Sequence, residues 1–215
     1  TSPPSPSGIG DDCAVVPPET SEHSLISSDA LVFGIHFDSS ITAKQAGQKI
    51  VLRNLSDIAA MGGHPKYATL SILSGSNLSF NWLHQFYKGI KASSDTYNLK
   101  IVGGDLCQLH DDHFQAVITI IGRAPKPILR HSASIADSIY VTGQLGGSIL
   151  EKHHNFQPRL AEGQWLAENN FASAMVDVTD GLAKELNFLT NESASIQINL
   201  KSIPLAQSAR TLAEK

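Results

Sequence analysis

The chain has 215 residues, 41% of them hydrophobic, and a formal net charge of −4 at pH 7. This length suffices for one large domain or two small ones with a real core, and the slight acidity gives no basic footprint for nucleic acid. No secretory signal and no apolar run long enough to span a bilayer are recognised, so we expect no membrane partner. The two cysteines form no C-x-x-C pair and suit a reducing compartment, which favours a cytoplasmic protein.

The first part of the chain alternates strand and helix patterns after a Pro/Ser-rich arm at residues 1–7, which we expect to be extended or mobile. Thr42 and Gln45 predict a capping box for a helix that ends before Gly62-Gly63, and Ser79 is the predicted cap of a second helix. Apolar runs and alternation predict strands at residues 24–28, 67–73, 99–102 and 113–122. Asp29 and the Gly103-Gly104-Asp105 turn would then follow strand ends.

The expected strand at residues 113–122 alternates cleanly and carries apolar residues on both faces. The strands expected before residue 124 are too few to close a barrel within one chain, and unpaired strand edges invite a second chain. The sequence therefore predicts a homodimer. We expect one face to be buried between subunits (Phe114, Ala116, Ile118 and Ile120) and the other to pack on helices of its own subunit (Val117 and Ile121).

The Ala124-Pro125-Lys126-Pro127 stretch predicts a boundary between a domain at 1–124 and a domain at 125–215. Beyond it we expect a glycine turn at 143–148 that leads into a short helix. The remaining patterns predict helices at 159–169, from 181 to about 190 and at 208–215, and strands at 137–142, 174–176 and 196–200. The whole chain is therefore predicted to have a two-domain α/β fold.

Most of the aspartates share one sequence context. Of twelve, seven lie at expected strand or helix ends beside Gly, Ser or Thr: Asp11, Asp12, Asp29, Asp57, Asp105, Asp177 and Asp180. Such short, rigid carboxylates suit hard, octahedral Mg²⁺, which is usually shared with nucleotide phosphates. One or two such acids would indicate loop capping, but five separate aspartate-containing turns favour metal–phosphate chemistry.

Other chemistries are less well supported. The chain has no G-x-x-x-x-G-K-[ST] loop, no protein-kinase motif set and no G-x-S-x-G nucleophile turn. The His110-Asp111-Asp112-His113 run is interpreted as a solvated turn between strands, and His153-His154 is likewise interpreted as a surface pair without a function.

Six ordered motifs carry a family resemblance: G-I-G-D-D, S-S-D-A-L-V-x-G-I-H-F, N-L-S-D-I-A-A-M-G, G-G-D, Y-V-T-G-x-L-G-G-S and D-V-T-D-G-L. Between Gly8 and about Leu186 the chain resembles the thiamine-monophosphate kinase family. That family belongs to an ATP-binding superfamily that includes aminoimidazole ribonucleotide synthetase and selenophosphate synthetase. No Cys- or Sec-containing loop of the selenophosphate type is present.

The resemblance implies an N-terminal mixed sheet that forms a barrel shared in a dimer, and a C-terminal α/β domain packed against it. It also implies in-line phosphoryl transfer from ATP to thiamine monophosphate, which gives thiamine diphosphate and needs no protein nucleophile. The implied magnesium ligands are Asp12, Ser27, Ser28, Asp29, Asp57, Asp105, Asp177 and Asp180, with Asp57, Asp105 and Asp177 expected to be the catalytic set. The implied nucleotide contacts are Gly104, Asp105, Arg130 and Thr179, and His36 is expected to touch the thiamine substrate.

Several positions depart from the family pattern: Phe33 replaces a common acid, Leu106 a common Thr and Thr179 the usual Ser. The G-G-E-D-Y-E-type motif that closes the family's substrate pocket is absent, so we expect an incomplete C-terminal domain. Two other functions therefore stay open: a truncated or non-catalytic relative that binds nucleotide and metal, and another enzyme of the superfamily. Without the resemblance, His36 would be interpreted as a core histidine.

Overall fold

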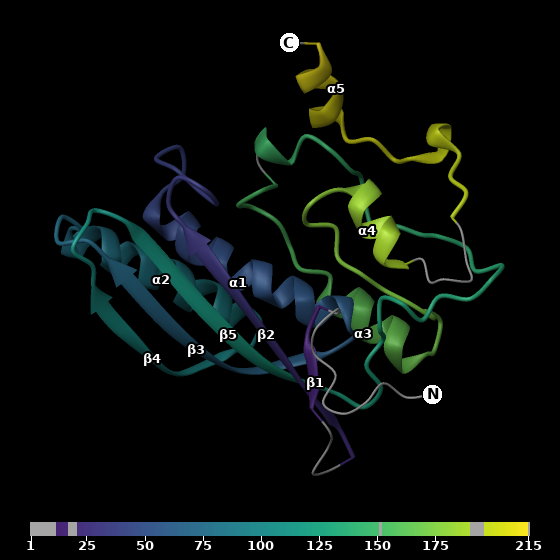
Figure 1. The fold of residues 1–215 in the computed structure, drawn as a ribbon, viewed down its shortest axis with the longest axis horizontal. Helices are drawn as coiled ribbons and strands as arrows, with labels where there is room; N and C mark the ends of the chain where they lie inside the picture. Colours follow the sequence, from purple (N-terminus) through teal and green to yellow (C-terminus); the bar gives the residue numbers. More distant parts are fainter. Residues whose placement is uncertain (1–11, 17–20, 151, 190–195, 215) are drawn as a thin grey trace.

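The computed structural model describes residues 12–16, 21–150, 152–189 and 196–214 (Figure 1). The expected arm at 1–7 and the start of the G-I-G-D-D motif lie outside the described residues. A twisted sheet and two long helices form the first part of the molecule, whereas the second part consists of short helices joined by extended segments.

Five strands form one mixed sheet in the order β1-β2-β5-β3-β4. All neighbouring pairs are antiparallel except β3 and β4, which are parallel. The expected strands of the first part are confirmed but are longer than the sequence indicated, so Asp29 and Asp105 lie within strands and not after them. The strands are β1 (Ala14–Val16), β2 (His23–Val32), β3 (His64–Ser74), β4 (Lys100–Gln108) and β5 (Phe114–Ala124).

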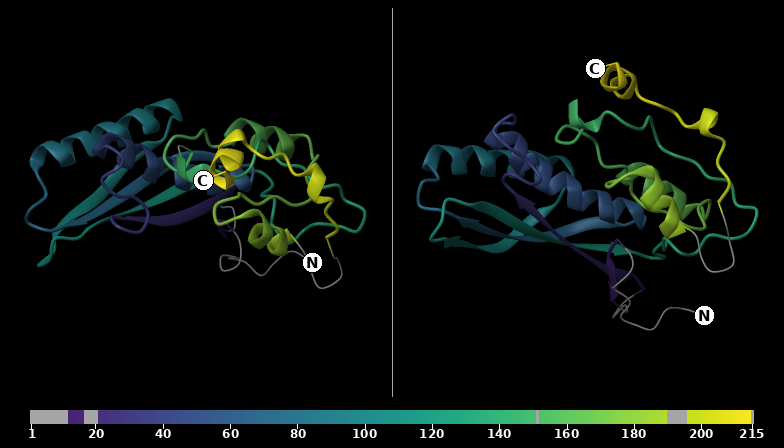
Figure 2. Two further views of the ribbon diagram at one scale, coloured as in Figure 1. Left: turned by 90° about the horizontal axis from the view of Figure 1, so that it is seen from above. Right: turned by 45° about the horizontal axis from the view of Figure 1, so that its top comes forward.

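Two helices, α1 (Ala43–Ala60) and α2 (Phe80–Thr96), cover one face of the sheet (Figure 2). The predicted capping box is confirmed: the Gln45 backbone N–H donates to Thr42 Oγ1 at 3.2 Å, and Thr42 N–H donates to Gln45 Oε1 at 2.8 Å. Ser79 caps α2 by accepting a hydrogen bond from Trp82 N–H at 3.1 Å. Both caps satisfy backbone donors that a helix start leaves without partners.

The contact between α1 and α2 depends on glycine. A Cβ atom on Gly47 would lie 2.0 Å from the Phe86 carbonyl oxygen, and one on Gly89 would lie 1.9 Å from the Lys44 carbonyl oxygen. Each helix therefore presents its glycine to the other's backbone, and the two helices pack as one layer on the sheet.

The expected orientation of β5 is wrong, because its two faces are exchanged. Phe114, Ala116, Ile118 and Ile120 are buried in the core of the chain itself. The Phe114 ring lies 5.2 Å from the Phe86 ring of α2, so this face packs under the helices. The opposite face, with Val117 half-buried and Ile121 37% exposed, is the one that α1 and α2 leave open. The more apolar face is the one that the helices cover, as the hydrophobic effect requires.

In the second part the expected helices are confirmed as α3 (Leu160–Glu168), α4 (Leu182–Leu189) and α5 (Gln207–Ala213), with short 3₁₀ turns η1 (Ser148–Leu150) and η2 (Leu200–Ser202). The strands expected at 137–142, 174–176 and 196–200 are wrong. These segments form no ladder with described residues, and only an isolated bridge joins Leu145 to Leu205 in this part. Alternation supplies a strand's pattern but not its pairing partner.

Helix α3 attaches the second part to the end of α1. A Cβ on Gly163 of α3 would lie 2.2 Å from the Ala59 carbonyl oxygen, and Gln164 Nε2 donates to the Gly63 carbonyl at 2.9 Å. No helix among the described residues is both long and apolar enough to cross a membrane.

Candidate active site

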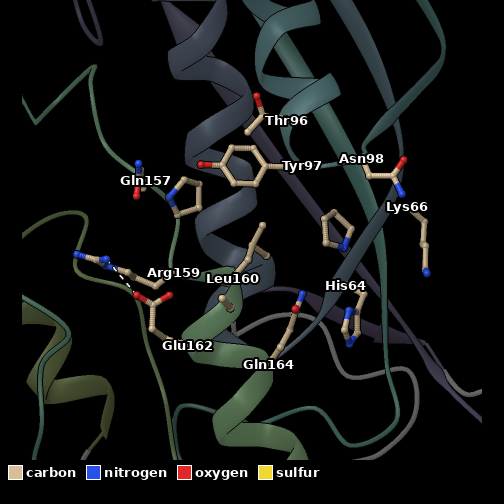
Figure 3. A pocket seen from close by; sticks show the side chains of 13 residues that line it. His64, Lys66, Thr96, Tyr97, Asn98, Gln157, Arg159, Leu160, Glu162 and Gln164 are labelled. Carbon is tan, nitrogen blue, oxygen red and sulfur yellow. Dashed lines mark hydrogen bonds and ion pairs between the residues drawn. The ribbon is translucent and has the colours of Figure 1, made fainter.

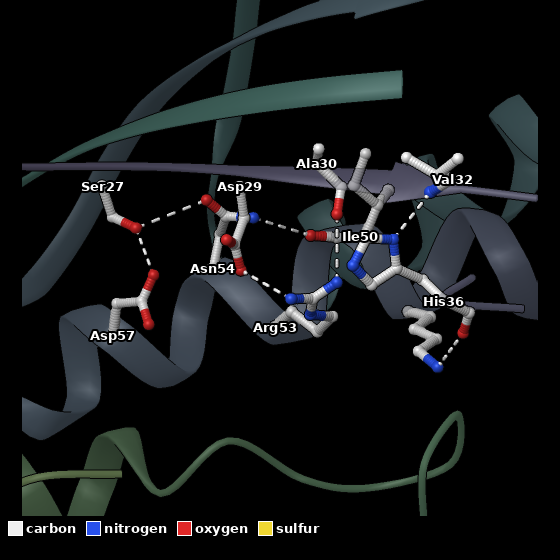
Figure 4. A network of polar contacts seen from close by, with 10 residues as sticks. Ser27, Asp29, Ala30, Val32, His36, Ile50, Arg53, Asn54 and Asp57 are labelled. Atoms are coloured by element: carbon white, nitrogen blue, oxygen red, sulfur yellow. Dashed lines mark hydrogen bonds and ion pairs between the residues drawn. The ribbon is translucent and has the colours of Figure 1, made fainter. Parts of the chain in front are cut away.

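Three charged residues follow one face of α1. Lys49, Arg53 and Asp57 are spaced four residues apart, so they lie in a row along the helix. The row faces β2, where Arg53 forms an ion pair with Asp29 at 3.2 Å and donates to the Ala30 carbonyl at 3.0 Å (Figure 4). This row changes from basic to acidic toward the C-terminal end of the helix.

Asp57 is held where α1 meets β2. Its carboxylate accepts a short hydrogen bond from the Ser27 hydroxyl, which also lies 3.4 Å from Asn54 Oδ1 (Figure 4). Asn54 is fully buried and donates through Nδ2 to the Ile50 carbonyl at 3.2 Å. The Ser27 hydroxyl therefore fixes the position of the Asp57 carboxylate, which the sequence placed one turn from the helix end.

The acid cluster consists of Asp12, Asp57 and Asp177. One oxygen from each carboxylate lies within 4.8 Å of the others, although the residues come from the segment before β1, the last turn of α1 and the extended segment before α4. Among the described residues, Asp177 Oδ2 is buried without a hydrogen-bond partner. A buried polar atom of this kind is costly unless a ligand satisfies it.

The electrostatics of the acid cluster favour a cation. Burial raises the pKa of Asp57 to about 8, and the nearby Asp177 carboxylate adds to this, whereas the Ser27 hydrogen bond opposes it. Burial also raises the pKa of Asp177, whereas the hydrogen bond to Ser56, the contact with Asp12 and the charge of Arg130 oppose this. Several buried carboxylates at close range cannot all ionise without compensating charge. Hard carboxylate oxygens are ligands that Mg²⁺ accepts, so the residues fit a magnesium site.

Arg130 connects the acid cluster to α4. Its guanidinium forms an ion pair with Asp12 at 2.8 Å and lies 4.6 Å from the centre of the Phe188 ring. Both charged side chains are nearly buried. Arg130 therefore fixes Asp12 in place and links it to the helix that follows Asp177.

Three other predicted magnesium ligands, Ser28, Asp105 and Asp180, lie outside the acid cluster. Ser28 lies on the opposite face of β2 from Ser27 and shares a hydrogen bond with Thr119 at 2.9 Å. Asp105 lies on the exposed strand β4, in register with Ser71, and strands β5 and β3 separate β4 from β2 in the sheet. Asp180 forms an ion pair with Lys184.

Three further predicted residues have distinct settings. Gly104 packs against β3, where a Cβ would lie 1.8 Å from the Leu70 carbonyl oxygen. Thr179 is exposed, and it follows Asp177 of the acid cluster by two residues in the sequence. His36 follows β2, and its Nδ1 accepts a hydrogen bond from Val32 N–H at 3.0 Å.

Sequence reasoning missed Lys49, Arg53 and Ser56. The signal was available: charged residues at i, i+4 and i+8 on a largely buried helix face are unusual, since long charged side chains are seldom buried. Ser56 gave no signal of its own, because its role depends on Asp177, which is distant in sequence.

A cavity of about 660 Å³ lies away from the acid cluster, between the start of β3, the end of α2 and the beginning of α3 (Figure 3). An ion pair between Arg159 and Glu162 at 3.0 Å crosses one side of it. None of its lining residues belongs to the acid cluster.

A family model and curated relatives both match most or more than half of this chain. Residues 10–124 match the family described as AIR synthase related protein, N-terminal domain. The thiamine-monophosphate kinase of Buchnera aphidicola from Acyrthosiphon pisum is 35% identical over 93% of this chain and 68% of its own length. The enzyme of the same name from Rhodopirellula baltica is 32% identical over 97% of this chain and 68% of its own length.

Solved structures show the same fold. The structure described as AaThiL complexed with AMPPCP and TMP superimposes with a TM-score of 0.88 at 27% identity, covering 96% of this chain and 72% of the other. The thiamine-monophosphate kinase of Stenotrophomonas maltophilia gives a TM-score of 0.79 at 28% identity, covering 95% of this chain and 72% of the other.

Proposed function

Because the chain belongs to the thiamine-monophosphate kinase family, we propose that it transfers the terminal phosphate of ATP to thiamine monophosphate and forms thiamine diphosphate. The observation that carries this proposal is the acid cluster of Asp12, Asp57 and Asp177. Phosphoryl transfer depends mainly on alignment and on neutralising charge around the transferred phosphate. A relative with the same fold was solved with AMPPCP and TMP, which supports both substrates.

Asp12, Asp57 and Asp177 would hold Mg²⁺ through their carboxylates. Magnesium bound there would neutralise charge on the triphosphate and on the developing transition state. Ser27 orients Asp57 through its hydroxyl, and Arg130 orients Asp12 through the ion pair. Asp29 remains a proposed outer ligand, because its charge acts on both Asp57 and Asp177.

The nucleotide would enter beside the acid cluster. Arg130 and Thr179 are its proposed contacts in the second part of the chain, since Arg130 already contacts Asp12 and Thr179 follows Asp177 closely. Ser28, Asp105 and Asp180 stand apart from the acid cluster, and we assign them no metal there. Gly104 has a packing role that accounts for its presence without a nucleotide.

The proposed assembly is a homodimer formed through the open face of the sheet. Tyr67 is 45% exposed and Ile121 37% exposed, and the two are paired in register across β3 and β5. Exposed apolar patches of this kind mark interaction surfaces. We also propose that the domains divide after residue 124, where β5 and the family match both end, and that the protein works in the cytoplasm.

The direct test measures thiamine diphosphate formed from ATP and thiamine monophosphate in the presence of Mg²⁺. Aminoimidazole precursors and selenide serve as alternative acceptors, and a chelator should stop the reaction. Turnover of another acceptor in place of thiamine monophosphate would assign the chain to a different enzyme of the superfamily. Tight ATP binding without any turnover would instead indicate a non-catalytic relative.

A further inference from the structure

Asp177 is the member of the acid cluster whose own backbone is least constrained. Asp57 belongs to α1, and Asp12 is fixed by its ion pair with Arg130. Asp177 instead lies in a segment, residues 174–178, that forms neither helix nor strand. A metal site needs its ligands at defined positions, and partners outside the ligand set usually provide that order. Another group must therefore determine where the Asp177 carboxylate lies.

Helix α4 holds this segment from its C-terminal side. The buried Glu185, in the first turn of α4, accepts a hydrogen bond from Asp180 N–H at 3.2 Å. This contact fixes the backbone three residues after Asp177. It does not involve the Asp177 side chain, so it does not set the direction of the carboxylate.

Ser56 makes a contact that does reach the Asp177 carboxylate. The two side chains are hydrogen-bonded, and the bond favours the ionised form of Asp177 against the effect of burial. An ionised carboxylate only accepts hydrogen bonds, so the Ser56 hydroxyl is the donor. Asp177 Oδ2 is buried and has no hydrogen-bond partner among the described residues. Ser56 therefore holds the carboxylate and leaves this oxygen available to an ion.

The place of Ser56 on α1 relates it directly to Asp57. The two residues are consecutive, so their side chains leave the helix about 100° apart. Asp57 is bonded to Ser27 of β2, whereas Ser56 is bonded to Asp177 in the second part of the chain. One helical turn thus supplies one ligand of the acid cluster and a hydroxyl that orients another.

The turn that carries this pair is firmly packed. The residues on either side of the pair, Leu55 and Ile58, are fully buried in the core. Just beyond them α3 lies so close that a Cβ on Gly163 would be 2.2 Å from the Ala59 carbonyl oxygen. A hydroxyl on such a turn has a fixed position, which its hydrogen bond passes on to the segment before α4.

We propose that Ser56 is a positioning residue, whose hydroxyl holds the Asp177 carboxylate where it completes a magnesium site with Asp12 and Asp57. This inference rests on the proposed function, because that function is what calls for magnesium. Ser56 acts through Asp177 and is not itself a ligand of the ion. Loss of such an outer partner typically weakens metal binding or activity by about 10- to 100-fold.

The first test measures Mg²⁺ binding to the full chain by calorimetry, with and without AMPPCP. Ser56→Ala should weaken binding roughly 10- to 100-fold, and Ser56→Thr, which keeps the hydroxyl, should restore most of the affinity. Ser94→Ala is the matched control, because it removes a buried hydroxyl of α2 that has no partner among the described residues. The proposal is wrong if Ser56→Ala binds Mg²⁺ normally, if Ser56→Thr is equally impaired, or if the wild type binds no Mg²⁺ under either condition.

The second test distinguishes a positioning role from support of the helix. Alanine is the best helix former, so the melting temperature of Ser56→Ala in a chelator should stay close to that of the wild type. Amide hydrogen exchange should become faster at residues 174–181, which lose an anchor, and should not change in α1. Faster exchange in α1 without a change at 174–181 would mean that Ser56 supports the helix and not Asp177.

Enzyme kinetics give a further readout that a general structural defect would not produce. In Ser56→Ala the Mg²⁺ concentration for half-maximal formation of thiamine diphosphate should rise by the same factor as the dissociation constant. The kcat at saturating Mg²⁺ should return toward the wild-type value, with an unchanged KM for thiamine monophosphate. A loss of kcat that saturating Mg²⁺ does not restore would contradict the positioning role.

The binding measurement also separates this inference from the proposed function. If the chain turns over no thiamine monophosphate but Ser56→Ala still binds Mg²⁺ more weakly than the wild type, the proposed substrate fails and the positioning role stands. If turnover occurs and Ser56→Ala binds Mg²⁺ as tightly as the wild type, the proposed function stands and the positioning role fails.

Discussion

At the scale of single residues, Asp57 is the side chain whose chemistry can be tested most cleanly. We expect Asp57→Asn to lower kcat on the order of 10²–10³-fold, as the loss of a group that stabilises transition-state charge does. Without metal, the melting temperature should not fall, because the amide replaces a buried carboxylate whose charged form is disfavoured. Asp111→Asn is the control, since Asp111 lies in an exposed turn beside His113. Near-normal turnover of Asp57→Asn at saturating Mg²⁺ would remove Asp57 from the metal site.

Lys49 gives a pH dependence whose sign is fixed by its burial. Burial lowers its pKa from 10.5 to about 8 in the folded chain. Between about pH 8 and 10.5 the unfolded chain still holds the proton that the folded chain has released, so the stability of the folded state rises with pH. Relative to Lys49→Met, the wild type should gain on the order of 1–3 kcal/mol across this window. Chemical denaturation at pH 7.5 and pH 10 measures the difference, and a constant difference would contradict it.

The residue scale also shows what the sequence was able to reveal about the site. Asp12, Asp57 and Asp177 were all anticipated, because their Gly- and Ser-rich contexts are typical of phosphate and metal sites. The contact of His153 with Lys49 was not anticipated, because it joins segments about a hundred residues apart in sequence. Such a contact leaves no local trace in the sequence.

At the scale of elements, the packing of α1 on α2 makes a sharp prediction. Gly47→Ala places a methyl group against the Phe86 carbonyl, so the helices must separate. We expect a loss of about 1–3 kcal/mol in the free energy of unfolding, the usual cost of overpacking. Gly103→Ala is the control, because the nearest atom to its Cβ is 3.9 Å away. Denaturant titration of both variants compares them, and equal stability would show that the helices separate freely.

Strand β5 provides a second comparison at this scale. Ile118 is fully buried beneath the helices, so Ile118→Asp should prevent folding through an unpaired buried charge. Ile121 lies on the open face, so Ile121→Asp should fold and convert the proposed dimer to a monomer. Circular dichroism and sedimentation velocity distinguish these outcomes. A folded monomeric Ile118→Asp variant would restore the first assignment of the two faces.

The elements also show where sequence patterns stop being informative. Caps, helix stops and strand alternation are local, so both long helices and all strands of the first part except β1 were found. Alternation on β5 gave two apolar faces without indicating which one the helices cover. The strands expected at 137–142, 174–176 and 196–200 have suitable composition, yet a strand forms only where another strand pairs with it.

At the scale of the whole molecule, magnesium should act as a ligand of the folded chain alone. Binding that requires the assembled acid cluster stabilises the fold by about 2.7 kcal/mol at a concentration one hundred times the dissociation constant. We therefore expect Mg²⁺ to raise the melting temperature of the wild type and not that of Asp57→Asn. Scanning calorimetry with and without a chelator makes the comparison. An equal rise in melting temperature in both proteins would mean that the magnesium ion binds outside the acid cluster.

The separation of Asp12 and Asp177 along the chain has a consequence for biosynthesis. Most of the described residues lie between them, so the loop that brings them together closes late and at an entropic cost. During translation the N-terminal part folds first, and a nascent chain that has not yet exposed Asp177 carries only two of the three carboxylates. We therefore expect the proposed magnesium site to form only once the polypeptide has emerged beyond this residue.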